Sequence, residues 1–241
     1  MAEQPVIAAF APTGTLRASI NTGNPILAHL DPATGQPAGV SVDLANELAR
    51  RLGVPLQLVT VTSAGAAVDN VEQGRADVGF FAIDPTRGQA IEFTKAYVEI
   101  EGVYAVRSDS PVTTAAEVDQ PGTTVAVSKG SAYDLFLSRT LHHATLVRLP
   151  TSLAIVQGFI EQKLSVAAGI RQQLEKDIAR VGGMRIVEPH FMIIRQAMAT
   201  PKAKGPEAAA YLAAFVEAMK SSGFVAQALA RNHINGASVA P

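Results

Sequence analysis

Short apolar segments alternate with amphipathic ones through the first third of the chain, and this alternation restricts the fold more than any other feature. Residues 16–20 (LRASI), 56–61 (LQLVTV) and 78–83 (VGFFAI) have the length and apolar content of strands. Residues 39–53 carry apolar side chains at helical spacing, and residues 64–73 form a second predicted helix. Strands that alternate with helices predict a parallel α/β sheet.

The alternation continues to the end of the chain. Further strands are predicted at 99–107, 124–128, 146–149, 165–170, 184–187 and 191–194. Further helices are predicted at 132–141, 151–164, 171–180, 206–220 and 223–231.

Composition excludes several classes of protein. The chain has 241 residues, of which 48% are hydrophobic and 17% charged, so it can bury the core of one large or two small domains. The net charge of −1, without a basic run, argues against nucleic acid as a partner. The absence of cysteine excludes disulfides and thiolate metal sites, and the histidines show no metal-ligand spacing. We therefore expect neither a metal nor a cofactor.

The segment between Gly74 and Tyr97 holds the first candidate for a ligand contact. A fully apolar strand ends at the break Asp84-Pro85, and Arg87 follows. Ligands of open α/β sheets bind at the carboxyl ends of strands. Arg87 is therefore expected where a small anion would be held, and the alternative is a solvated loop arginine.

This segment resembles the family 3 extracellular solute-binding proteins, which are the amino-acid-type receptors of ABC transporters. The matching residues are Gly74, Asp77, Arg87, Phe93 and Tyr97. The helix predicted at 39–53 also resembles a helix of this family, and the resemblance extends over about residues 14–231.

The resemblance implies an α/β fold of the type II periplasmic-binding-protein class. Each of its two lobes would hold a mostly parallel sheet flanked by helices, with a central cleft. Lobe 1 would be discontinuous, with residues 1–107 and 194–241, and lobe 2, with residues 108–193, would be inserted into it.

The function implied by the resemblance is capture rather than catalysis. A monomer would bind a small carboxylate-bearing metabolite, either a dicarboxylate or an amino acid, close by a hinge, and deliver it to the membrane subunits of an ABC importer. The resemblance implies the periplasm, but residues 1–14 show no export signal, so the cytoplasm is the alternative. Two other functions are open: an enzyme of the prephenate or cyclohexadienyl dehydratase type on the same fold, and a metabolite-sensing receptor domain.

Ligand contacts are expected in both lobes. By resemblance, Arg87 grips the ligand's carboxylate. The strand at 124–128 leads into Gly130, Ser131 and a helix start, which predicts free backbone N–H groups and a positive potential. In the family this turn binds a carboxylate, and the alternative is an ordinary turn. Asn21 and Asn24 follow the first strand and are either ligand contacts or turn formers.

Three positions depart from the family pattern. Ala82 and Asp84 stand where the family often has serine and threonine. We expect Asp84 to cap the turn and orient Arg87, or else to supply a counter-charge to an amine. The strand at 165–170 usually ends in Gly-Asp, whose carboxylate pairs with an α-ammonium, but here Arg171 follows Ile170. If Arg171 faces the ligand together with Arg87, two cations without a matching anion favour a ligand with two carboxylates, or with one carboxylate and another anionic group. Otherwise Arg171 is an exposed helix residue.

Overall fold

The computed structural model describes residues 3–241, and the chain divides into two compact units. Unit 1 contains the chain up to Glu99 together with Arg195–Pro241, and unit 2 contains Ile100–Ile194.

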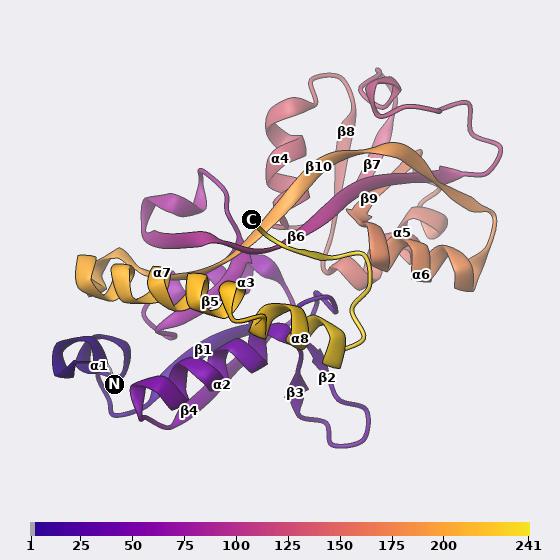
Figure 1. Ribbon diagram of the computed structural model, residues 1–241. Helices are drawn as coiled ribbons and strands as arrows, with labels where there is room; N and C mark the ends of the chain where they lie inside the picture. The colour runs from indigo at the N-terminus through magenta and orange to yellow at the C-terminus, as the bar shows by residue number, and fades with distance from the viewer. Residues whose placement is uncertain (1–2) are drawn as a thin grey trace. The chain divides into compact units, whose positions relative to one another are not determined.

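The elements of unit 1 come from both ends of the chain (Figure 1). In chain order they are α1 Gln4–Phe10, β1 Leu16–Asn21, β2 His29–Leu30, β3 Pro37–Ala38, α2 Val40–Leu52, β4 Leu56–Val61, α3 Ala64–Glu72, β5 Val78–Ala82, η1 Arg87–Gln89, the first part of β6 Ile91–Arg107, the last part of β10 Met184–Pro201, η4 Lys202–Lys204, α7 Pro206–Ser221, α8 Phe224–Arg231 and β11 Ser238–Val239.

The sheet of unit 1 has a parallel core. Strand β1 lies between β4 and β5 and is parallel to both, while β10 pairs antiparallel with β5. Strand β11 adds to the unit 1 part of β6, where Ser238 lies opposite Glu99. The carboxyl ends of β1 and β5 therefore lie at the same edge of the sheet.

Both faces of β5 are covered, which explains its uninterrupted apolar sequence. All of its residues are buried. Phe81 packs in a cluster with residues of α3, such as Val68 and Val71, while Phe80 meets the ring of Tyr97 edge-on. A strand buried on both faces is positioned rigidly, and so is the segment that leaves its end.

Helix α2 shows how local sequence fixes the frame of unit 1. It begins after Gly39, whose φ of 123° favours glycine. In addition, a Cβ at this position would lie 2.5 Å from the carbonyl oxygen of Leu27. It ends at Gly53 in the left-handed conformation. Its buried face includes Leu44 and Leu48, and the helix packs against β1, β4 and α8.

Unit 2 is formed by the middle of the chain. Its elements are the second part of β6, η2 Ala115–Glu117, β7 Thr124–Ser128, α4 Ala132–Thr140, β8 Thr145–Leu149, η3 Ser152–Ala154, α5 Ile155–Glu161, β9 Val166–Ile170, α6 Arg171–Val181 and the first part of β10. Strand β7 is parallel to β8 and β9, and β9 pairs antiparallel with β6.

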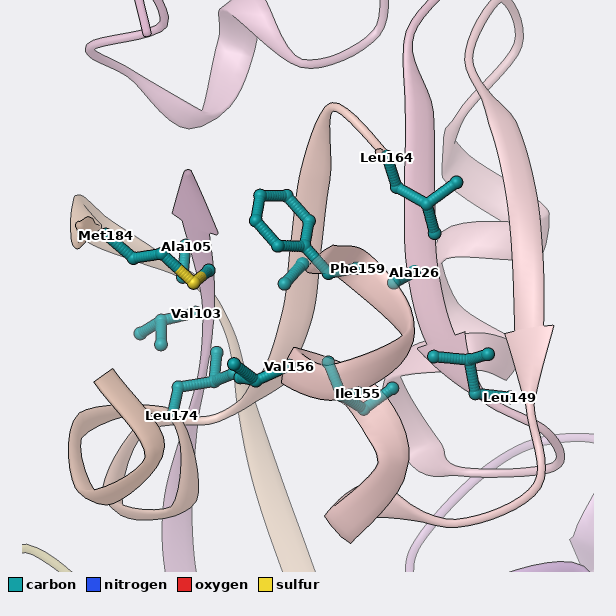
Figure 2. Packing of buried hydrophobic residues seen from close by; sticks show 11 residues of the cluster. Val103, Ala105, Ala126, Leu149, Ile155, Val156, Phe159, Leu164, Leu174 and Met184 are labelled. Carbon is teal, nitrogen blue, oxygen red and sulfur yellow. The ribbon is translucent and has the colours of Figure 1, made fainter. Parts of the chain in front are cut away.

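The core of unit 2 forms where two helices cover this sheet. Figure 2 shows Val156 and Phe159 of α5 and Leu174 of α6 among the side chains of β6 and β7. All of these side chains are buried, and Val156 and Phe159 belong to the helix predicted at 151–164.

The observed fold differs from the expected one in three respects. The first boundary between the units lies after Glu99 rather than after Arg107, because residues 102–105 of β6 pair with β9. The strands predicted at 184–187 and 191–194 are one continuous strand, β10. Helix α1 and the β2–β3 hairpin were not predicted, since both are too short to give a periodic signal.

Among residues 3–241, no helix is both long enough and apolar enough to cross a membrane.

Candidate functional site

Arg87 lies just beyond the carboxyl end of β5, as the sequence predicts, but it is not solvated. The side chain is buried, with 5% of the residue exposed, and its Nη1 donates to the carbonyl oxygen of Ala82 at 3.1 Å. The backbone N–H of Arg87 donates to the carbonyl of Asp84 at 3.1 Å, which starts the short helix η1. The turn after β5 therefore folds the guanidinium back onto the end of that strand.

Asp84 organises this turn. Its Oδ1 accepts hydrogen bonds from the backbone N–H of Thr86, at 2.9 Å, and from the Thr86 hydroxyl. An aspartate that bonds to the backbone two residues later is typical of a turn that follows a strand. The capping role expected for Asp84 is thus present, and its carboxylate is buried close to Arg87.

The charge of Arg87 is offset within unit 1. Burial lowers the pKa of the Arg87 guanidinium to about 10, while the negative charges of Asp84 and Glu72 act in the opposite direction. The group remains a cation at neutral pH. A ligand that meets Arg87 therefore also meets the field of these carboxylates.

Gln196 lies opposite the last residue of β5 and was not among the predicted site residues. Strand β10 places it directly opposite Ala82, and only 4% of the residue is exposed. Within the described part of the chain, its side-chain oxygen has no hydrogen-bond donor. The only signal in the sequence was a glutamine next to the apolar run of residues 197–199.

Asn21 and Asn24 form turns at the end of β1. The Oδ1 of Asn21 accepts the backbone N–H of Gly23 at 2.9 Å, and that of Asn24 accepts the N–H of Ile26 at 3.2 Å. The side-chain oxygens of both residues thus stabilise turns, as one of the two alternatives predicts. A contact of either residue with a ligand remains a prediction.

The turn at Gly130 and Ser131 differs from the prediction of free donors. The backbone N–H of Gly130 donates to Oδ2 of Asp134 at 2.8 Å, and that of Ser131 donates to the carbonyl of Ser128 at 3.0 Å. The Ser131 hydroxyl accepts the N–H of Asp134, so the side chains of Ser131 and Asp134 both stabilise the start of α4. A carboxylate of the chain itself thus occupies the place predicted for the ligand's carboxylate.

Asp134 is held there by further contacts in unit 2. Its carboxylate accepts from Arg148 Nε at 3.0 Å and from the Ser138 hydroxyl at 3.3 Å, and the residue is buried. The spacing Ser131-x-x-Asp134 at the start of a helix was the sequence signal for this cap. Ligand binding by the Gly130 amide would require Asp134 to leave it.

Arg171 starts α6, as predicted, but it has matching anions. Its guanidinium forms a bidentate pair with Glu188, with both N–O distances at 2.7 Å, and it pairs with Glu101 of β6. Glu175 adds a longer contact, at 3.4 Å. The hydrogen bonds and charges of Glu188 and Glu101 raise the pKa of Arg171 above its usual value. The premise of an uncompensated second cation is therefore wrong, because residues distant in the sequence supply its counter-charges.

The described residues contain no group of three or more His, Asp or Glu side chains that could hold a metal ion. The candidate group at the end of β5 is the buried guanidinium of Arg87. Guanidinium groups bind carboxylates through directed, charge-assisted hydrogen bonds.

A family model and solved structures match the chain. The model of bacterial extracellular solute-binding proteins, family 3, matches residues 16–233. A mutant of ArgBP from T. maritima has a similar structure, with 21% sequence identity, a TM-score of 0.80 and coverage of 95% of this chain and 100% of that one. No curated protein sequence matched the chain.

Two further structures share the fold. The amino acid ABC transporter substrate-binding protein AbpA from Streptococcus pneumoniae, bound to L-arginine, is 18% identical, with a TM-score of 0.79 and coverage of 93% of this chain and 96% of that one. The ancestral amino acid-binding protein AncCDT-1, a precursor of cyclohexadienyl dehydratase, is 20% identical, with a TM-score of 0.77 and coverage of 93% and 98%. Their likeness confirms the mixed α/β fold of type II periplasmic binding proteins. Because the family model spans nearly the whole length, the chain belongs to the family 3 bacterial extracellular solute-binding proteins.

Proposed function

We propose that this protein captures a small carboxylate-bearing metabolite of the amino-acid type outside the cytoplasm and delivers it to the membrane subunits of an ABC importer. Membership of the extracellular solute-binding family supports the compartment and the transport role. The AbpA structure similar to this chain is that of an amino acid ABC transporter protein with L-arginine bound. The periplasm and a monomeric state follow from the resemblance and remain predictions, as does closure by a hinge.

The strongest support for a carboxylate ligand is the position of Arg87. It is a buried cation at the carboxyl end of a central strand, and its guanidinium is held by the carbonyl of Ala82. A guanidinium has five N–H donors, so it can bind a carboxylate while it keeps its bond to a carbonyl. A buried charge-assisted hydrogen bond of this kind contributes about 1.5–3 kcal/mol.

The charge balance around Arg87 favours an amino acid over a dicarboxylate. Asp84 and Glu72 already act on the guanidinium, so a second ligand carboxylate would add to a local excess of negative charge. An α-ammonium would offset the charge of Asp84. In unit 2, the groups first expected to take a second carboxylate are engaged with Asp134, Glu101 and Glu188.

A ligand screen by thermal unfolding tests the proposal. The protein is heated with each of the L-amino acids, with monocarboxylates and with dicarboxylates. A ligand at 100 times its dissociation constant stabilises the folded state by about 2.7 kcal/mol. We expect shifts with one or a few amino acids and smaller ones with dicarboxylates.

Other outcomes of the screen would support other functions. A larger shift with a dicarboxylate than with any amino acid would contradict an amino-acid ligand. Consumption of prephenate by the protein would favour the dehydratase alternative, whereas an absence of any shift would contradict capture of a small carboxylate.

A further inference from the structure

We propose that Thr86 is a positioning residue of the candidate site in unit 1, which holds the Asp84 carboxylate where its negative charge stabilises the Arg87 guanidinium. The consequence for ligand binding rests on the proposed function, because it requires that Arg87 binds the ligand's carboxylate. Thr86 was not among the predicted site residues, and it is exposed at the surface.

Thr86 fixes one oxygen of the Asp84 carboxylate. The backbone N–H of Thr86 donates to Asp84 Oδ1 at 2.9 Å, and the Thr86 hydroxyl donates to the same oxygen. Asp84 is buried, with 5% of the residue exposed, so solvent competes little for this oxygen. Because both donors come from one residue, they restrict the rotation of the carboxylate and fix the place of its charge.

The same turn ties Arg87 to Asp84 through the backbone. The carbonyl oxygen of Asp84 accepts the N–H of Arg87 at 3.1 Å and that of Gly88 at 3.2 Å. At the far end of the side chain, Arg87 Nη1 donates to the carbonyl oxygen of Ala82 at 3.1 Å. Residues 82–88 therefore form one closed turn, in which the acid and the guanidinium are both held in place.

A fixed carboxylate matters at this position because the guanidinium is buried. Burial disfavours the charged form and lowers the pKa of Arg87 to about 10, while the charge of Asp84 acts against this effect. Glu72, the last residue of α3, acts in the same direction, but it is exposed and contributes less. A guanidinium needs both its charge and its orientation to bind a carboxylate, and Thr86 acts on both through Asp84.

The titration of Arg87 tests this role without a ligand. NMR of protein with isotope-labelled arginine follows each guanidinium from neutral pH to about pH 11, and Arg87→Lys identifies the signal of Arg87 by its loss. We expect a wild-type midpoint at about pH 10. Asp84→Asn keeps an acceptor for Thr86 but removes the charge, so its midpoint should fall. Thr86→Val removes only the hydroxyl, so its midpoint should lie between the other two.

Two matched variants separate this role from a general effect of substitution. Thr86→Ser keeps the hydroxyl and should titrate as the wild type does. Glu72→Gln removes the exposed carboxylate that acts on Arg87, so its midpoint should fall less than that of Asp84→Asn. A thermal melt checks that Thr86→Val is folded, as we expect for an exposed side chain.

Ligand binding at neutral pH gives the second measurement. The probe is the L-amino acid that shifts the melting temperature of the wild-type protein most, and calorimetric titration measures its affinity. Thr86→Val should bind it about 5-fold more weakly, the equivalent of one hydrogen bond. Thr86→Ser should bind it within about twofold of wild type.

The outcomes separate this role from the proposed function. If Arg87 titrates in Thr86→Val at the same pH as in wild type or at a higher one, or does not titrate below about pH 11 in either, the role of Thr86 is wrong. A lowered midpoint with unchanged affinity for the amino acid also overturns it, because Thr86 would then not position Arg87 for a ligand.

Two further results are decided in advance. If Thr86→Val does not fold, Thr86→Ala takes its place with the same expected midpoint and affinity. A wild-type protein that binds no probe contradicts the proposed function, whereas the NMR titration still decides whether Thr86 holds the charge at Arg87.

Discussion

The backbone N–H of Gly130 donates a hydrogen bond to the carboxylate of Asp134 at 2.8 Å, at the start of α4. The start of a helix presents unpaired N–H groups and a positive potential, which attract an anion. In this protein the anion is a side chain of the same helix, and Arg148 pairs with it from β8. The carboxylate thus secures the turn between β7 and α4.

Removal of this carboxylate should destabilise the protein. We expect Asp134→Ala to lower the free energy of unfolding by about 1–3 kcal/mol, because the cap of α4 and the buried acceptor of Gly130 are lost together. Urea denaturation measures the change. Asp134→Asn, which keeps an acceptor for the Gly130 amide, should lose less. Equal stability of wild type and Asp134→Ala would show that the contact contributes nothing.

Arg87→Ala should abolish most of the affinity for the amino acid that the thermal screen identifies. We expect a loss of about 2–5 kcal/mol of binding free energy, since a carboxylate would face Asp84 and Glu72 without a cation. Arg87→Lys should lose less binding free energy, because lysine keeps the positive charge but lacks the paired N–H donors of a guanidinium. Arg50→Ala removes an arginine of α2 whose side chain is 71% exposed, and calorimetric titration should find it equal to wild type. An unchanged affinity in Arg87→Ala would remove this residue from the site.

Arg171→Ala should affect stability rather than binding. Its guanidinium is satisfied by Glu101 and Glu188, so we expect the affinity for the same amino acid to stay within about twofold of wild type. The free energy of unfolding should fall by about 1 kcal/mol, because the three side chains are partly exposed to solvent, which screens the pairs. The two quantities are measured by calorimetric titration and urea denaturation. A 10-fold or greater loss of affinity would restore Arg171 as a ligand residue.

Asp77 should make the stability of unit 1 dependent on pH. Burial works to raise the pKa of this carboxyl, but hydrogen bonds from Arg17 at 2.9 Å and Lys204 at 2.8 Å outweigh it and hold the pKa below its usual value. A carboxyl whose pKa is lower in the folded state stabilises that state above its unfolded pKa of about 4, and this stabilisation is lost as the pH falls further.

The comparison of wild type with Asp77→Asn measures this contribution. In urea denaturation between neutral pH and pH 3, the stability difference between the two proteins should be largest at neutral pH and should shrink below about pH 4. Other carboxyls with lowered pKa values, such as Glu47, affect both proteins equally. A difference that stays constant with pH would contradict the assigned role of Asp77.

Much of the fold could be predicted because it depends on local sequence. The apolar spacing of residues 39–53 predicts α2, which the structure has at Val40–Leu52, and the apolar run before Asp84 predicts the buried strand β5. The place of Arg87 after β5 also follows from local sequence, because a strand that ends in Asp-Pro leaves the next residues at the edge of the sheet.

The partners of the candidate site residues could not be predicted in this way. Arg171 and Glu101 are 70 positions apart, and nothing in the sequence near Arg171 indicates that β6 brings a carboxylate to it. Gln196 is placed beside Ala82 only by the register of β10 against β5.

The sequence by itself determined the family, the order of helices and strands, and the candidate cation at the end of β5, because each of these depends on residues close together in the chain. The tertiary structure decided which of the candidate charges are already compensated, as at Gly130 and Arg171. Those properties depend on distances between segments that only folding brings together, since hydrogen bonds and ion pairs act over a few ångströms.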